Sequence, residues 1–421
     1  MSYLHRNRLA LAATGILVLV LALIAADLPA SLRVWSLRSM GTTQLETLVR
    51  RNPEDLEARY QLGLTYARGN RHVEATREFL SVLARDPARH EVLNDLGASY
   101  LLQERYYEAL VALQGALLAK PDSAVAYANL GRLHLATRMP FTAVRELEKS
   151  VQLDGRKATV HCDLGEAYQR TLNVNGALRS YQRAIQVDPK NLQARVGLGK
   201  AYFSLTRYQE AEAEFKRALE IDPSYASALL SLGRMKLEQG VTRADWEAAQ
   251  PLLTRAAELD PADPEARFDL GRVHLRLKQP DRAVEHLVRA LQLSPEHPGA
   301  THQLSRALRL AGREADADRV ERTFREMALN TREESRLEER VHQQPNDWNS
   351  LAKLAGLYIR SGKTSLAALM CQRLEHGAPG HEQLPALNSA LRQAAARAEV
   401  YRKQPSGAGP SSRAESGTAG L

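Results

Sequence analysis

The sequence predicts an all-α protein: a solenoid of stacked helix pairs preceded by one transmembrane helix. Three observations support this prediction. Leu and Ala, strong apolar helix formers, carry most of the 44% hydrophobic share, while aromatic residues make up only 5%. One residue pattern returns at a constant interval along most of the chain. An uncharged stretch near the N-terminus is long enough to cross a bilayer.

The N-terminal segment predicts a membrane anchor. Residues 1–8 form a short basic tail, and residues 9–26 then continue without a single charge. As a helix this stretch would span about 27 Å, close to the thickness of a bilayer core. We expect an uncleaved signal anchor, although Ala25 and Ala26 leave a cleaved signal peptide open. Residues 27–40 are expected to form a linker.

From residue 42 onward one phrase recurs with a fixed period. A Leu-Gly pair is followed by Ala twelve residues later, by a large apolar residue four positions further on, and by a closing proline. The interval between successive glycines of these pairs is constant, and they are Gly63, Gly97, Gly131, Gly165, Gly199 and Gly233. Small residues at fixed positions allow two helices to approach closely, and proline ends the second helix.

This pattern resembles the tetratricopeptide repeat in period and in residue types. The resemblance implies a right-handed α-solenoid of helix-turn-helix units, covering residues 41–311, whose first helices line a concave surface. The array is expected to begin with a half repeat at Leu45, Leu48 and Pro53. Four extra residues, around 241–246, are expected to form a longer loop between the two helices of the sixth unit.

The C-terminal part keeps the pattern less well. Residues 312–344 are expected to complete a degenerate repeat, in which Ser305 replaces glycine, and to continue as a long charged helix. Residues 345–402 are expected to form a last repeat-like unit and a capping helix. Residues 403–421 are rich in Gly, Ser, Ala and Pro, a composition typical of disorder.

The candidate binding residues follow from the resemblance, because in this family the residue after Leu-Gly faces the groove. Basic residues occupy this position in most units. They and two basic neighbours on the same helices are Arg132, Lys200, Arg234, Arg272, Arg276, Arg306 and Arg309. Stacking would align them into a cationic ladder suited to an acidic peptide or a terminal carboxylate. The alternative is that exposed helix positions in an arginine-rich chain are often basic without a binding role.

No catalytic, cofactor or metal site is predicted, and we expect no small-molecule substrate. Gly362-Lys363-Thr364 resembles the end of a phosphate-binding loop, but Leu357 stands where that loop needs glycine, so a turn between helices is expected. Cys162 and the histidines at the repeat's Tyr position, such as His134 and His274, are interpreted as packing residues. The net charge of +8 lacks the aromatic run that specific nucleic-acid binding would need.

These observations predict a membrane-anchored scaffold that binds other proteins and assembles complexes, and not an enzyme. We expect a single-pass inner-membrane protein of a bacterial cell envelope with the repeats in the periplasm. One alternative is a regulatory or substrate-presenting subunit of a membrane enzyme such as a glycosyltransferase. Another is an enzyme with its active site in the eighth unit or in the insertion at residues 241–246, although no converging polar residues are evident there.

Overall fold

The computed structural model describes residues 30–294 and 297–403, and every regular element in these ranges is a helix. This part of the chain forms two compact units that meet between Ala317 and Asp318. The first unit holds the regular repeats, and the second holds the C-terminal helices. An all-helical solenoid of repeated helix pairs, as predicted, is therefore confirmed.

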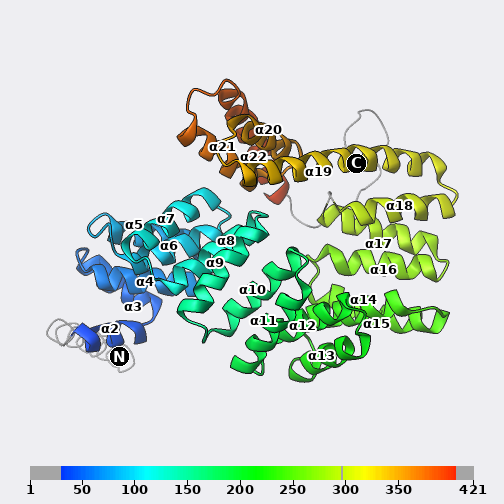
Figure 1. Cartoon of the computed structure of the whole chain (residues 1–421), viewed down its shortest axis with the longest axis horizontal. Helices are drawn as coiled ribbons and strands as arrows, with labels where there is room; N and C mark the ends of the chain where they lie inside the picture. Colours follow the sequence, from blue (N-terminus) through cyan, green and yellow to red (C-terminus); the bar gives the residue numbers. More distant parts are fainter. Residues whose placement is uncertain (1–29, 295–296, 404–421) are drawn as a thin grey trace, which may run out of the picture. The chain divides into compact units, whose positions relative to one another are not determined.

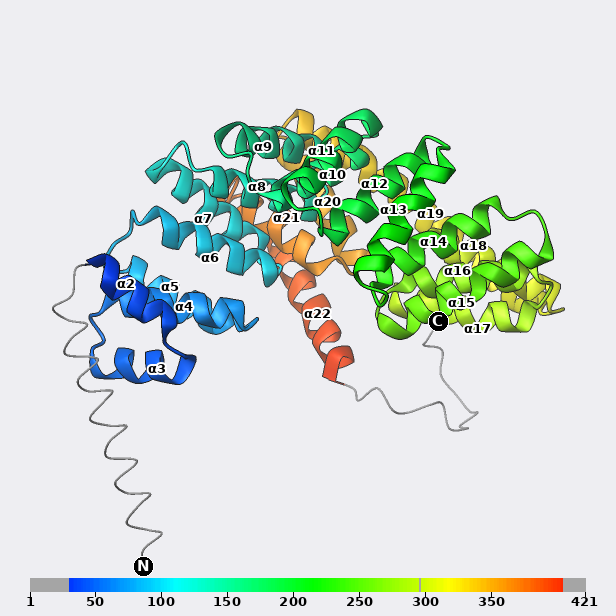
Figure 2. The same ribbon diagram turned by 90° about the horizontal axis from the view of Figure 1, so that it is seen from below.

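Helix pairs follow one another in sequence order through the first unit (Figure 1, Figure 2). The first helices of the pairs are α4 (Leu56–Arg68), α6 (His90–Leu102), α8 (Ala124–Ala136), α10 (Ala158–Arg170), α12 (Leu192–Ser204), α14 (Ala226–Gln239), α16 (Pro264–Arg276) and α18 (Pro298–Leu310). The second helices are α5 (His72–Leu83), α7 (Tyr106–Ala119), α9 (Pro140–Leu153), α11 (Val174–Val187), α13 (Tyr208–Ile221), α15 (Arg243–Leu259) and α17 (Pro280–Leu293).

The first and second helices occupy different sides of the stack. Each first helix from α4 to α16 contacts the first helix of the next repeat directly. Second helices contact the first helices on either side of them and make no comparable contact with one another. The first helices are therefore the more closely spaced layer, and their exposed sides form the inner face of the unit.

Glycines of the first helices receive large side chains of the second helices. Gly63 lies against Phe79, and Gly131 lies against Leu147; the same pairing recurs in every regular repeat. A Cβ atom on the repeat glycines, from Gly63 to Gly271, would lie only 2.4–2.8 Å from the nearest atom of the opposing side chain. The small residues of the sequence pattern are thus required by the close approach of the two helices.

A three-residue turn joins the helices of each regular pair. Its middle residue adopts a left-handed conformation, with φ between 56° and 60° at Asn70, Glu104, Arg138, Leu172, Thr206 and Lys278. The next residue donates its N–H back to the carbonyl at the repeat's Tyr position, as Arg71 does to Tyr66 at 2.9 Å. This closes the first helix with the hydrogen bond of a Schellman motif, which normally uses glycine at the left-handed position.

Arginines near the start of two first helices connect neighbouring elements. Arg59 donates from Nε to the carbonyl of Pro53 at 2.7 Å and pairs with Glu78 at 2.9 Å. Arg195 repeats the arrangement, with its guanidinium bound to the Pro189 carbonyl at 2.6 Å and to Glu214 at 3.1 Å. Each arginine therefore connects its first helix to the proline that ends the preceding repeat and to its own second helix.

The seventh repeat lacks the carboxylate of this arrangement. Its arginine is Arg267, and His286 stands at the position of the glutamate. The Nε atom of Arg267 is buried without a hydrogen-bond partner in the described part of the chain. His286 instead stacks on the buried His274, with ring centroids 5.1 Å apart and planes 3° from parallel. The pKa of His286 is lowered by burial and then by the neighbouring His274 and Arg267.

The four extra residues of the sixth repeat lengthen its helices rather than its loop, which corrects the expected loop insertion. Residues 240–242 form a connection of the same length as the others, although without a left-handed residue, while α14 gains one residue and α15 gains three relative to α12 and α13. Thr242 and Asp245 close a capping box at the start of α15. Helix formation is favoured because added residues gain backbone hydrogen bonds that a longer loop would leave to solvent.

The segment before the first full repeat is also more helical than expected. Of the predicted linker 27–40, residues Ala30–Ser39 form α2, and the expected half repeat is α3 (Thr42–Arg51). Arg33 pairs with the N-cap residue Asp55 at 2.6 Å, and Leu37 is fully buried. These two side chains hold α2 against α4.

The second unit begins within α19 (Glu314–Gln343), the long charged helix expected from the sequence, and continues with α20 (Trp348–Arg360), α21 (Thr364–Gly377) and α22 (Leu384–Lys403). Lys363 lies in the turn between α20 and α21 and pairs with the buried Glu334 at 2.6 Å. This segment is therefore a turn between two helices, and its lysine is held in an ion pair. The predicted disordered tail lies outside the described residues except at Lys403, the last residue of α22.

The predicted localisation, a single-pass membrane protein, is corrected. Across residues 30–294 and 297–403, no helix combines the length and the apolar character needed to cross a bilayer. The stretch 9–26, on which the prediction depended, lies outside the described residues. An uncharged run of this length is by itself an ambiguous signal, because other targeting segments share it. Membrane anchoring therefore forms no part of the function proposed below.

Candidate protein-binding surface

A chain of polar side chains links the inner face of the first repeats. The Tyr60 hydroxyl of α4 donates to Asp95 of α6 at 2.6 Å. Asn94, beside it, donates to the same carboxylate at 3.1 Å and accepts from Asn129 of α8 at 2.9 Å. Burial raises the pKa of Asp95 even though the hydrogen bonds from Tyr60 and Asn94 oppose this shift. The groups are satisfied by one another, which fixes their positions before any partner arrives.

Arg132 extends this chain into the fourth repeat. Its Nη1 atom donates to the side-chain oxygen of Asn129 at 3.1 Å, and its Nε atom donates to Asp163 of α10 at 2.6 Å. A hollow of about 120 Å³ beside it is also lined by Asp154 and Lys157. The predicted ladder residue Arg132 therefore lies on the inner face but is already paired with an acid of the next repeat.

A second network joins α14 to α16. Arg234 binds Asp269 and Glu265, both at 2.6 Å. Arg272 binds the other oxygen of Asp269 at 3.0 Å and reaches back to Glu238 of α14 at 2.7 Å. Asp269 is completely buried, and burial raises its pKa even though Arg234 and Arg272 oppose this shift. Two further predicted ladder residues, Arg234 and Arg272, are thus held in internal ion pairs.

His297 connects this network to α18. Its Nε2 atom lies 3.0 Å from Glu265, and its Nδ1 atom accepts the N–H of Ala300 as the N-cap of the helix. The hydrogen bond from His297 and the charge of Arg234 hold the pKa of Glu265 at about 2. The carboxylate is therefore ionised at any physiological pH.

The remaining predicted residues are less constrained. The guanidinium of Arg276 lies 5.7 Å from the ring centroid of Trp246, within cation–π range. Arg309 lies 3.8 Å from Glu314. Lys200 and Arg306 are exposed, and the side chain of neither forms an ion pair or hydrogen bond with the residues that the structure describes. Within the described ranges, these two positions therefore present positive charge without a paired acid.

Lys200 lies in a crowded part of the inner face. Its side chain is exposed, yet its pKa is lowered, first by desolvation from the surrounding protein and then by the charge of Arg234. On a concave surface, an amine can be accessible to a partner and still have fewer water molecules around it than on a convex surface. A carboxylate beside it would stabilise the protonated amine against both effects.

The spacing of acidic residues explains which ladder members are paired. In two repeats an aspartate lies three positions before the ladder position and pairs with the ladder arginine of the preceding repeat. Asp163 pairs with Arg132 in this way, and Asp269 pairs with Arg234. For Lys200 the equivalent position of the next repeat is Ser231, which carries no charge. The predicted ladder thus consists of paired and unpaired members, and the acidic positions that distinguish them were visible in the sequence.

Other residues considered for chemistry have structural roles. Cys162 is buried, and burial raises its pKa to about 12, which makes the thiol a poor nucleophile. His274 is buried against His286, as expected of a packing residue, whereas His134 is half-buried. Among the residues that the structure describes, no group of three or more His, Cys, Asp or Glu side chains is placed to hold a metal ion.

Comparison with known sequences identifies the repeat. Sequence models described as tetratricopeptide repeats match residues 162–226 and 241–300 in one case and residues 37–93 in another. The chain contains tetratricopeptide repeats. The matched segments include the repeat glycines Gly63, Gly165, Gly199 and Gly271. A search of curated proteins finds no match.

Solved structures of tetratricopeptide-repeat proteins are similar in fold. A repeat protein from Parabacteroides merdae ATCC 43184 is 15% identical over 60% of this chain and 98% of its own, with a TM-score of 0.51. PilF of Pseudomonas aeruginosa is 20% identical over 52% of this chain and 97% of its own, with a TM-score of 0.43. YrrB, described as a protein with an unusual peptide-binding site, is 21% identical over 45% of this chain and 96% of its own, with a TM-score of 0.32.

The similarity to the Parabacteroides merdae protein supports the fold alone, and the broad functional class follows from the matches to the repeat models. Tetratricopeptide-repeat proteins are generally non-catalytic scaffolds that bind other proteins or peptides. They do so because stacked repeats create a long continuous surface without needing a single deep cavity. The inner face described above is such a surface.

Proposed function

We propose that the chain is a protein-binding scaffold that assembles complexes by holding segments of partner proteins on the inner face of its first unit. The observation that supports this proposal most directly is the pair of unneutralised cations on that face, Lys200 and Arg306. They lie on α12 and α18, on either side of the ion-paired network of α14 and α16. A partner that reaches both would lie along this network.

The charges on this part of the inner face favour an acidic partner. Lys200 is partly desolvated, so it gains more from a partner carboxylate than a fully hydrated lysine would. Arg276 and Arg309 add positive charge on α16 and α18. Arg234 and Arg272 contribute differently, because their own acidic neighbours already hold them and a partner must compete for their remaining donors. We therefore assign the selection of acidic segments to Lys200 and Arg306.

The test uses a defined probe. A fluorescein-labelled peptide of alternating Glu and Leu residues is titrated with the full chain, and fluorescence anisotropy gives the Kd. Charge reversal by Lys200→Glu together with Arg306→Glu should weaken binding by roughly 100-fold, about tenfold for each lost contact. Binding should also weaken as salt is raised.

A matched control separates a site from net charge. Lys149→Glu together with Arg179→Glu changes the net charge equally, but both residues are exposed on second helices. The control should leave the Kd within about twofold. Equal losses in the two double variants, or no loss in either, would refute the assignment of the inner face.

A further inference from the structure

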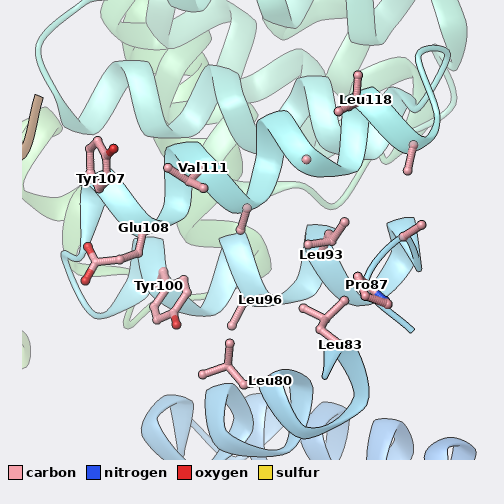
Figure 3. A pocket seen from close by; sticks show the side chains of 14 residues that line it. Leu80, Leu83, Pro87, Leu93, Leu96, Tyr100, Tyr107, Glu108, Val111 and Leu118 are labelled. Carbon is pink, nitrogen blue, oxygen red and sulfur yellow. The ribbon is translucent and has the colours of Figure 1, made fainter. Parts of the chain in front are cut away.

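Two places in the first unit depart from the repeat pattern outside the inner face. One is an apolar hollow of about 630 Å³, lined by Leu80 of α5 and by Val111 and Leu118 of α7 (Figure 3). Gly115 of α7 borders it and stands where the next three second helices have a long basic side chain, Lys149, Arg183 or Arg217. Nothing in the described residues indicates what would cover this hollow. The other place is the seventh repeat, where an arginine lacks the acidic partner of its counterparts.

This arginine, Arg267, occupies a repeat position at which two other arginines hold a carboxylate. In the first repeat Arg59 pairs with Glu78 at 2.9 Å, and in the fifth repeat Arg195 pairs with Glu214 at 3.1 Å. The side chains of both glutamates are largely buried, being 14% and 9% exposed. Between the two helices of a repeat, the fold therefore accommodates one carboxylate beside an arginine at this position.

In the seventh repeat no described residue supplies this carboxylate. His286 replaces the glutamate, and Arg267 forms no ion pair or hydrogen bond with the residues that the structure describes. Arg195 also has an unpaired Nε atom, but both of its terminal nitrogens are bonded. Glu285, beside His286, is exposed and does not pair with Arg267. A buried N–H group without an acceptor destabilises the folded state, so an acceptor from elsewhere would be favourable.

The stacking of the repeats does not require an arginine at this position. Four other regular repeats form the same pairs of helices without one. Their residues at this position are Leu93, Tyr127, His161 and Leu229. The unpaired guanidinium of Arg267 is therefore a local feature of the seventh repeat and not a consequence of helix packing.

The cluster around Arg267 is accessible from solvent. Arg267 and His286 are each half-buried, and of their side-chain nitrogens only the Nε atom of Arg267 is both buried and unpaired. The ring of His286 stacks on His274, whose Nδ1 atom lies 2.8 Å from the side-chain oxygen of Gln279. Burial lowers the pKa of His286, and the charges of His274 and Arg267 lower it further. An anion placed here would offset this local excess of positive charge.

We propose that Arg267 and His286 form a binding site for a carboxylate that comes from outside the chain and takes the place of the missing glutamate. The planar guanidinium presents donors that match the two oxygens of a carboxylate, and His286 donates a further hydrogen bond when it is protonated. The site lies between α16 and α17, so it is additional to the inner face. The carboxylate belongs to a small organic acid or to an acidic side chain of a partner protein.

Acetate tests the site directly. The resonance of the Arg267 Nε–H group in the ¹⁵N-labelled full chain is followed while sodium acetate replaces sodium chloride at constant pH and ionic strength. We expect a saturable shift with a Kd of about 10–100 mM, as for one charge-assisted contact. The Nε–H group of Arg195 is the internal control and should not shift, because Glu214 already holds its guanidinium.

A second ligand distinguishes the two sources of the carboxylate. The α-amide of N-acetylglutamic acid presents the same group on a peptide side chain. Binding of both ligands would support a site for a partner's side chain, and binding of acetate alone would support a site for a small acid. A wild type in which neither ligand gives a saturable shift of Arg267 would overturn the proposal. The inner-face assignment would be unaffected, since its test uses different residues.

His286→Glu is the decisive variant, because it restores within the chain the ion pair of the first and fifth repeats. The response of Arg267 to acetate should weaken by at least about tenfold, while the helical circular dichroism signal is retained. Gln292→Glu adds the same charged side chain at an exposed position of α17 and should leave the Kd within about twofold. An acetate response that persists in His286→Glu would also overturn the proposal, because the ligand would then lie elsewhere.

Discussion

Replacing Gly97 by alanine tests whether the repeat glycines are required by helix packing. The added Cβ atom would lie 2.6 Å from Cγ and 2.8 Å from Cδ2 of Leu113, and 3.3 Å from the carbonyl oxygen of Ala109. Leu113 is fully buried, and its Cγ atom cannot move without moving the whole side chain. Such overpacking costs about 1–3 kcal/mol. Alanine recovers about 0.5–1 kcal/mol through its higher helix propensity.

Gly115→Ala is the matched control, because Gly115 lies in the second helix of the same repeat. Its Cβ atom would meet Leu93 at 3.6 Å, an ordinary van der Waals contact. The helix-propensity gain is common to both substitutions and cancels in their difference. The free energy of opening should therefore be about 1–3 kcal/mol lower in Gly97→Ala than in Gly115→Ala.

Native-state hydrogen exchange of the α6 and α7 amides is the appropriate assay, because repeat arrays open locally and a single melting temperature averages over them. A difference of about 1.4 kcal/mol corresponds to a tenfold change in exchange rate. Equal exchange rates in the two variants would refute the argument that Gly97 is required by the close approach of α6 and α7.

Three further outcomes are expected. The pKa of His286 is lowered in the folded state, so the unfolded chain binds a proton at this residue more readily. The melting temperature should therefore fall as pH drops below about 6.5, and His286→Glu should flatten this dependence on pH. Arg234→Leu should cost about 1–3 kcal/mol in urea denaturation, because it removes a partner from the fully buried Asp269, and an unchanged midpoint would contradict the ion-pair assignment. Thr206→Gly should stabilise the chain by about 1 kcal/mol because Thr206 is β-branched and has φ 59°, whereas Asn70→Gly should gain only a few tenths since asparagine tolerates that conformation.

The fold was largely predictable because its strongest signal is periodic. The spacing of Gly63 and its successors reports a contact that every repeat makes, so a single sequence contains many copies of the same information. The insertion in the sixth repeat was located correctly but misinterpreted as a loop, because its effect on helix length depends on capping by Thr242 and Asp245. The helix at Ala30–Ser39 was missed because its contacts, such as Arg33 with Asp55, join residues outside the repeat pattern.

The binding surface was less predictable because it depends on pairs of residues in different repeats. The basic positions were identified one repeat at a time, whereas the pairing of Arg132 with Asp163 becomes visible only when one repeat is read against the next. The apolar hollow required the same comparison among second helices, since Gly115 and Leu118 are ordinary residues when each is taken alone. The membrane prediction failed for a different reason: a run of apolar residues determines hydrophobicity but does not determine where the chain is located.

The lengthened sixth repeat shows how such an array can acquire new features without losing its stacking. Its four extra residues extend the free end of a helical hairpin by about one turn, so Ala249 and Leu253 keep the buried positions that their counterparts hold in other repeats. The connection at the new tip has the same length as the others but no left-handed residue, and the indole N–H of Trp246 donates there to the Gly240 carbonyl at 3.0 Å. Residues added at the tip of a hairpin can therefore change the exposed surface without changing the contacts through which one hairpin packs on the next.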